Sequence, residues 1–213
     1  WGLFWLPLRA FEEHGLSAGW TTLAVFATPA LALLPFTIIR LLRGKPFGAR
    51  HAAAGLLAGG AVALYAESVL LTDVARALIL FYVTPVWSTI LELLFLKRRM
   101  TKARSLALIL GLAGLITILG GRSGLPLPQN TGDTLALLSG VVWACGSLWI
   151  RKSSDVETFE NVFSFFLFGS AVALCLVLVL PGEVIGSTPD SAVMQDLFLW
   201  LVVAAVAFMI PVM

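Results

Sequence analysis

The chain has 213 residues, of which 59% are apolar and 12% charged, with a net charge of +2 and a mean hydropathy of +0.97. A soluble domain carries about 25% charged residues, so this composition excludes a soluble enzyme or binding domain. The two cysteines, Cys145 and Cys175, lie in apolar runs and the two histidines stand alone, so the sequence predicts no metal site and no cofactor.

Long apolar runs follow one another along the whole chain. A helix needs about 20 apolar residues to cross a bilayer, and six runs approach that length: 20–39, 52–71, 77–96, 103–121, 134–150 and 162–180. Residues 1–8 look like the second half of a helix, and 197–213 form a further run that is still apolar at the last residue. A signal peptide is the alternative for the N-terminus, but it lacks a basic segment and a small-residue cleavage site. We therefore expect an all-α polytopic membrane protein, with a sequence that is a fragment at both ends.

Basic residues concentrate in alternate loops between these runs. Residues 40–50 hold four, 97–104 hold five and 151–152 hold two, which together are 11 of the 14 in the chain. The positive-inside rule places these loops in the cytoplasm, so we expect a cytoplasmic N-terminus and residence in the inner (cytoplasmic) membrane. A nucleic-acid patch is the alternative for 97–104, but this segment lies directly between two spans, and no nucleic-acid partner is predicted.

A weak internal repeat relates two parts of the chain. Residues 1–9 read WGLFWLPLR and residues 143–151 read WACGSLWIR, an offset of 142. The same offset carries the second and third helices onto the seventh and eighth. Five helices fit in one period, and because five is odd the second unit enters the membrane from the opposite side, as in many secondary transporters. This predicts a ten-helix inverted-repeat (5+5) fold with about eight helices present: a first repeat 1–121, an extracytoplasmic linker 122–133 and a second repeat 134–213.

The segment 75–121, ARALILFYVTPVWSTILELLFLKRRMTKARSLALILGLAGLITILGG, resembles the EamA family of the drug/metabolite transporter superfamily. The matching features are a proline after the first turns of a helix, a short turn and a glycine-rich helix, carried by Pro85, Met100-Thr101, Gly111, Gly114, Gly120 and Gly121. The Trp-Gly start of the chain, with Pro7 and Arg9, is similar to that family too. The resemblance implies ten helices in two inverted halves with a substrate cavity between them. One departure is Lys97-Arg98-Arg99, where the family usually has a glutamate, so no role of that glutamate is carried over.

Glu67 is a carboxylate inside the third helix, near its outer end. Polar groups within a span are costly, so each is a functional candidate. One interpretation is a carboxylate near the interface, hydrogen-bonded to Tyr65 or Ser68 or paired with Arg76. The other is a cavity carboxylate that meets a substrate amine or a proton.

The fourth helix carries a polar stripe, because Tyr82, Pro85, Thr89 and Glu92 recur at spacings of three or four and share one face. We expect this stripe to point into the bundle, where Pro85 frees a backbone carbonyl for a cavity. Glu92 either forms a salt bridge to the basic turn that follows or serves in coupling. Trp87 lies about 140° from Tyr82 around the helix and either lines the cavity edge or packs against a neighbour.

The sixth helix presents Ser139, Trp143 and Ser147 on one face, and its repeat partner offers Trp1 and Trp5. The tryptophans near span ends suit the interfacial belts: Trp20, Trp149 and Trp200. The predicted substrate-binding residues are Trp5, Tyr65, Glu67, Tyr82, Trp87, Thr89, Trp143 and Ser147.

An aromatic, sparsely charged cavity suits an amphipathic organic solute with an apolar body. The sequence thus predicts a secondary transporter of small organic metabolites that works by alternating access, as a monomer in the lipid bilayer. Within the superfamily, the aromatic lining makes YddG-type exporters of amino acids, aromatic ones included, the nearest expectation. A membrane enzyme is the alternative, but Glu67 and Glu92 lie at opposite ends of their helices and form no acid cluster. A non-transporting subunit is a third reading, against which the polar stripe argues.

Overall fold

The structure is a computed structural model that describes residues 5–13, 16–44, 47–97, 99–120, 128–152 and 158–180. These residues form helices and no strand: α1 Trp5–Glu13, α2 Ala18–Leu42, α3 Ala49–Leu71, α4 Val74–Phe81, α5 Thr84–Phe95, α6 Lys102–Gly120, α7 Thr131–Lys152 and α8 Thr158–Val179. The predicted all-α fold is confirmed. The last apolar run, 197–213, lies outside the described residues.

Five segments of the described chain are long and apolar enough to cross a membrane: α2, α3, α4 together with α5, α7 and α8. Five of the six predicted runs of about 20 residues therefore correspond to spans, and the chain is a multi-pass membrane protein. The remaining run, 103–121, corresponds to α6, which is not among these five segments. Each helix begins before its apolar run, and some also end after it; α7, for example, begins at Thr131 and ends at Lys152 rather than covering 134–150. Polar end residues can complete helical turns at the membrane surface, where apolar content is no guide to helix length.

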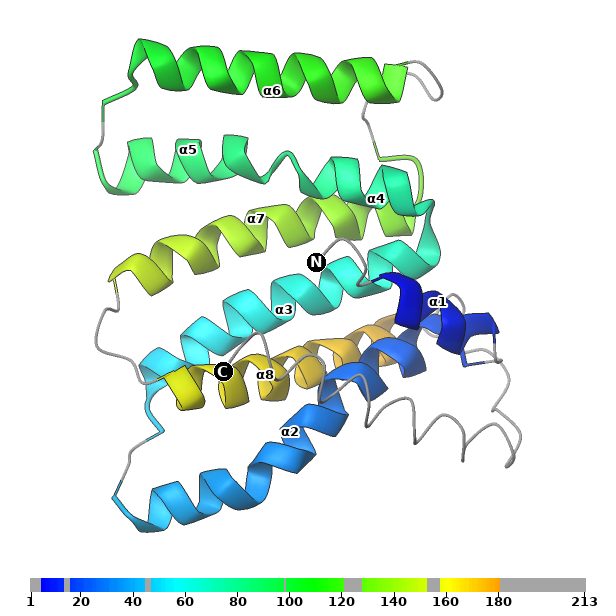
Figure 1. The fold of residues 1–213 in the computed structure, drawn as a ribbon, viewed down its shortest axis with the longest axis vertical. Coiled ribbons are helices and arrows are strands. Elements are labelled where there is room, and N and C mark those ends of the chain that lie inside the picture. The colour runs from blue at the N-terminus through cyan, green and yellow to red at the C-terminus, as the bar shows by residue number, and fades with distance from the viewer. Residues whose placement is uncertain are drawn as a thin grey trace.

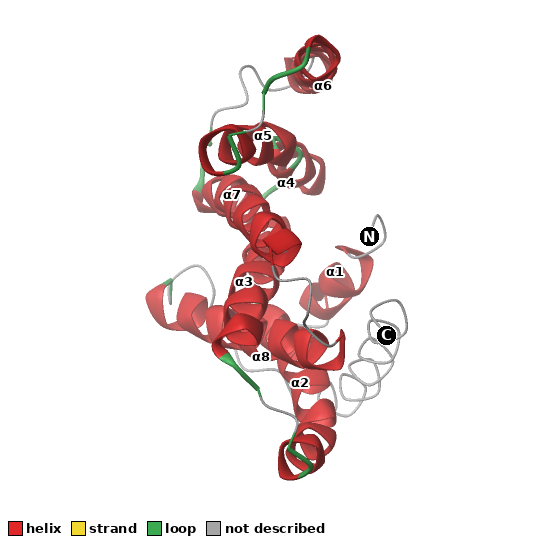
Figure 2. Ribbon diagram, turned by 90° about the vertical axis from the view of Figure 1, so that its left-hand side faces the viewer, coloured by secondary structure: helices red, strands yellow, loops and turns green. Residues whose placement is uncertain are grey.

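The helices lie side by side in the order α6, α4–α5, α7, α3, α8, α2 from top to bottom of Figure 1. α3 packs against both α7 and α8, and it has the largest buried share of the five spans. α2 packs on α8, while α6 lies at the opposite edge of the layer (Figure 2). The centre of the bundle is thus formed by helices that are far apart in the sequence.

Glycines allow α3 and α8 to approach closely. Two glycine patterns in the sequence predict close approach to a neighbouring helix: Gly55–Gly59, and Gly111 with Gly114. A Cβ atom added at Gly59 would lie 2.0 Å from the carbonyl oxygen of Phe165 on α8, so the first prediction is confirmed. Nothing lies within 4 Å of a Cβ atom added at Gly111 or Gly114, so the second is wrong for the described chain. The reason is the position of α6 at the edge of the layer.

Gly59→Ala is expected to lower the free energy of unfolding by about 1–3 kcal/mol, because the added methyl group forces α3 and α8 apart. The matched control is Gly114→Ala, which should be neutral or stabilise by up to about 1 kcal/mol, since alanine favours the helix and the site is open. Reversible unfolding in mixed micelles measures both variants. Equal effects of the two substitutions would contradict this account of the α3–α8 contact.

Charged residues at the two ends of the bundle are paired between helices. Arg76 Nε of α4 lies 2.6 Å from Asp133 Oδ2 of α7, and Arg9 donates to two carbonyl oxygens at the end of α3 at 2.8 and 3.0 Å. At the opposite end, Arg40 Nε of α2 lies 2.7 Å from Glu160 Oε1 of α8. These pairs connect helices whose apolar faces already pack together.

The C-terminal ends of α2, α5 and α7, at which the basic residues concentrate, all lie at the left of Figure 1. Their positive charge predicts that this end faces the cytoplasm. In a variant whose native cysteines are replaced by serine, Met100→Cys should react with a membrane-impermeant maleimide only from the cytoplasmic side. Pro128→Cys, at the opposite end, should react only from outside. Outside labelling at position 100 would reverse the orientation.

Candidate functional site

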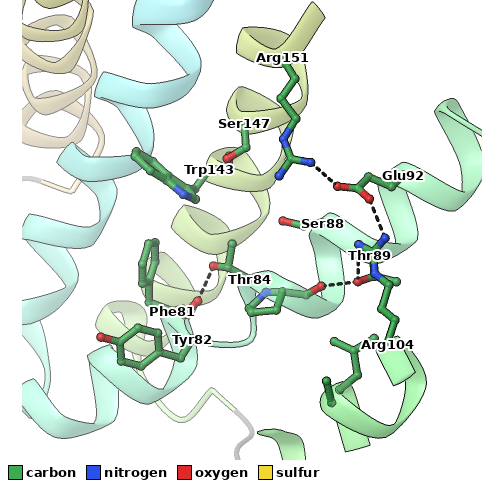
Figure 3. A pocket seen from close by; sticks show the side chains of 13 residues that line it. Phe81, Tyr82, Thr84, Ser88, Thr89, Glu92, Arg104, Trp143, Ser147 and Arg151 are labelled. Atoms are coloured by element: carbon green, nitrogen blue, oxygen red, sulfur yellow. Dashed lines mark hydrogen bonds and ion pairs between the residues drawn. The ribbon is translucent and has the colours of Figure 1, made fainter. Parts of the chain in front are cut away.

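The span formed by α4 and α5 is broken at Tyr82 and Val83, where α4 has ended and α5 has not begun. Pro85 causes the break, since a proline has no N–H to donate to the carbonyl oxygen four residues earlier, that of Phe81. The Thr84 hydroxyl donates to this oxygen instead (Figure 3). The freed carbonyl oxygen is thus already bonded to a neighbouring side chain, and its use by a cavity stays a prediction.

A pocket of about 590 Å³ lies beside this break, within the range of about 300–1,000 Å³ of ligand pockets. Its walls come from α4, α5, α6 and α7. The lining residues are Phe81, Tyr82, Thr84, Pro85, Ser88, Thr89, Glu92, Arg104, Ala107, Leu108, Trp143, Ser147 and Arg151. The predicted polar stripe of 77–96, now α4 and α5, thus lies along one wall. The face of α7 with Trp143 and Ser147 forms another (Figure 3).

One end of the pocket is ionic. Glu92 accepts a hydrogen bond of 2.7 Å from Arg104 Nη1 of α6 and another of 2.7 Å from Arg151 Nη1 of α7. Arg104 Nη2 also donates to Thr89 Oγ1 at 3.1 Å. The predicted salt bridge of Glu92 to the basic segment that follows it is confirmed, because Arg104 belongs to that segment, 97–104. Arg151 of α7 is a second partner that the sequence did not predict. The turn after α5 has Lys97 exposed with its φ at +49°, and Arg104 returns to Glu92 from the first turn of α6.

The other end of the pocket is aromatic. The rings of Phe81 and Tyr82 lie below the Trp143 indole in Figure 3, and Tyr82 is 61% exposed. Ser147 uses its hydroxyl on its own helix, where it donates to the Trp143 carbonyl oxygen at 2.9 Å. The pocket therefore combines a charged end with an aromatic end.

Half of the predicted site residues line this pocket: Tyr82, Thr89, Trp143 and Ser147. The other four lie outside it. Tyr65 is buried in the core with its ring 5.0 Å from that of Phe81, and Trp5 packs against the same core. Trp87 has a buried Nε1 without a hydrogen-bond partner among the described residues. Sequence reasoning did not include Arg104 and Arg151 in the site, although they lie in the first turn of α6 and the last turn of α7, at the ends of apolar segments.

Glu67 is fully buried on α3, away from this pocket. Neither of its carboxylate oxygens forms a hydrogen bond in the described part of the chain, although Thr22 of α2 is close enough to interact. The predicted partners act elsewhere, since Arg76 pairs with Asp133 and the Ser68 hydroxyl donates to the Tyr65 carbonyl oxygen. The predicted hydrogen bonds of Glu67 are therefore absent among the described residues, and its depth in the membrane stays a prediction.

Comparison with known proteins identifies the family of this chain. A model of the EamA-like transporter family matches residues 1–120, which is more than half of the 213 residues. The chain belongs to the EamA-like transporter family. No curated protein and no solved structure matches it. The resemblance noted over 75–121 is thereby confirmed, and this EamA-like protein is a membrane transporter of small molecules.

The family match covers only some of the helices that line the pocket of the EamA-like chain. α4, α5 and α6 lie within the matched residues 1–120, whereas α7, with Trp143, Ser147 and Arg151, lies beyond them. The Glu92–Arg151 pair therefore joins the matched unit to the segment that follows it.

Proposed function

We propose that the pocket beside the α4–α5 break is the substrate site of a secondary transporter that exports small organic metabolites of the amino-acid type. The observation that carries this proposal is the convergence of the α4–α5 stripe with Trp143 and Ser147 of α7 on one pocket of ligand size. The interrupted span supports it, because discontinuous helices commonly form the substrate sites of transporters. A site between the matched unit and α7 also suits alternating access, in which two units move against each other.

The chemistry of the walls supports the substrate class. The aromatic end offers a rigid apolar surface for an organic side chain. The ionic end offers donors in Arg104 and Arg151 and an acceptor in Glu92, which are the partners of a carboxylate and an ammonium group. We propose further that the protein acts as a monomer in the inner membrane, with its N-terminus in the cytoplasm.

Transport by the complete protein in proteoliposomes tests this function. Vesicles preloaded with an unlabelled amino acid should accumulate the labelled one by exchange, with saturation, when a panel of amino acids is screened with and without a pH gradient. Dependence on the gradient would add proton coupling to the mechanism. Failure of every organic solute to move would overturn the proposal, and conversion of a solute without movement would favour a membrane enzyme.

A further inference from the structure

The ionic end of the pocket carries an excess of positive charge. Two arginines and one glutamate are the charged members of the lining, so the described residues contribute a net charge of +1. All three groups lie together, with Glu92 between Arg104 and Arg151 (Figure 3). A pocket with this balance attracts an organic anion and repels an organic cation of the same shape.

The two arginines differ in how far they are committed to protein partners. Arg104 has a side chain 32% exposed and donates to both Glu92 and Thr89. Arg151 has a side chain 61% exposed, and among the described residues it donates to Glu92 alone. A guanidinium has five N–H donors in a planar fork that matches a carboxylate. Among the described residues, Arg151 is thus the more exposed of the two arginines and uses fewer of its donors on protein partners, so it is better placed than Arg104 to bind a ligand.

Glu92 can release Arg151 without becoming an unpaired buried ion. Its side chain is only 7% exposed, and a buried carboxylate that loses all its partners is strongly destabilising. The Arg104 pair at 2.7 Å remains when Arg151 turns to another acceptor. Exchange of one carboxylate for another on Arg151 therefore keeps every charge paired.

We propose that the pocket recognises a carboxylate on an aromatic or apolar body, and that this carboxylate replaces Glu92 on Arg151 while the body lies against Trp143. The proposal rests on the proposed function, whose substrate class it narrows. The exchange also breaks the Glu92–Arg151 ion pair between α5 and α7, so binding removes one interhelical contact at this end. A free ammonium group on the ligand meets Glu92, which makes a zwitterion acceptable, whereas an amine without a carboxylate is rejected.

Three probes with one body test the charge requirement: 3-phenylpropanoate, its amide and 3-phenylpropylamine. Equilibrium binding to the complete protein in detergent should favour the carboxylate over the amide by about tenfold or more, the loss expected for a charge-assisted hydrogen bond. The amine should bind more weakly still. Equal binding of acid and amide, or tighter binding of inorganic phosphate than of the acid, would overturn the proposal without any substitution being needed.

The Arg151→Gln variant tests whether the carboxylate binds at Arg151. It should weaken binding of 3-phenylpropanoate about tenfold or more and leave the amide unchanged, which also shows that the pocket is intact. Arg99→Gln removes the same charge from an exposed position at the same end and should change neither. A preference for the acid that survives Arg151→Gln overturns the assignment. If the protein transports neutral or cationic solutes but does not bind the acid, this inference fails and the proposed function stands; if it binds the acid and transports nothing, the reverse holds.

Discussion

Asp133→Ala is expected to lower the free energy of unfolding by about 3–5 kcal/mol, because it breaks a buried ion pair. The Asp133 side chain is fully buried and lies 2.6 Å from Arg76 Nε, whose side chain is only 10% exposed. Thr72 Oγ1 and the backbone N–H of Gln129 donate to the same carboxylate, each at 2.9 Å. The substitution removes the acceptor of the nearly buried Arg76 guanidinium contact and of two further hydrogen bonds at once.

The position of Asp133 explains why this loss spreads through the bundle. Its partners belong to the end of α3, the first turn of α4 and the segment that leads into α7, so one carboxylate joins three helices. Asp133→Asn keeps the shape and some acceptors but loses the charge, so its effect should be smaller. Glu13→Ala, an exposed carboxylate at the same end, should stay within about 0.5 kcal/mol. Reversible unfolding in mixed micelles measures all three, and a stability of Asp133→Ala equal to that of Glu13→Ala would refute the role given to this residue.

The sequence alone predicts the spans of this protein well, because crossing a membrane imposes a length and a composition that are visible locally. Pro85 likewise predicts a disturbance of its span, since the loss of an N–H is a local event. The same sequence cannot say that Thr84 satisfies the freed oxygen, because that depends on a side-chain rotamer. Gly55 and Gly111 stand in similar apolar surroundings, yet only one of them meets another helix. The two glycines differ because α3 has a neighbouring helix at Gly55, whereas no described helix packs on α6 at Gly111.

For the candidate site too, local features are predictable from the sequence, whereas contacts between helices are not. A helical period places Tyr82 and Thr89 on one face, and both line the pocket. The period also separates Trp87 from that face, and it lies outside the pocket. The basic segment 97–104 predicts a partner for Glu92, but no local pattern brings Arg151 to it, because their meeting requires α7 to flank α5. The inverted repeat that would generate such an arrangement remains a prediction.

Trp143→Ala is expected to reduce transport by about tenfold or more, because it removes the aromatic contact and the apolar area that the solute buries against it. Trp143 lines the pocket from α7 and is the largest side chain in its wall. Trp143→Phe keeps an aromatic ring and should retain most of the rate. The exposed Tyr82 offers less buried surface, so Tyr82→Ala should have a smaller effect in the same direction.

The control for Trp143→Ala must separate a loss of substrate contact from a loss of packing, because Trp143 also packs against the core. Trp20→Ala removes an indole that is 41% exposed and lies outside the pocket, so transport should remain close to that of the parent. Exchange rates in proteoliposomes are compared at equal amounts of inserted protein, together with the affinity of each variant for the transported solute. A pocket residue should raise the apparent KM, whereas a packing residue should reduce the amount of folded protein and leave KM unchanged. An unchanged KM and an unchanged rate in Trp143→Ala would remove this pocket from the transport pathway.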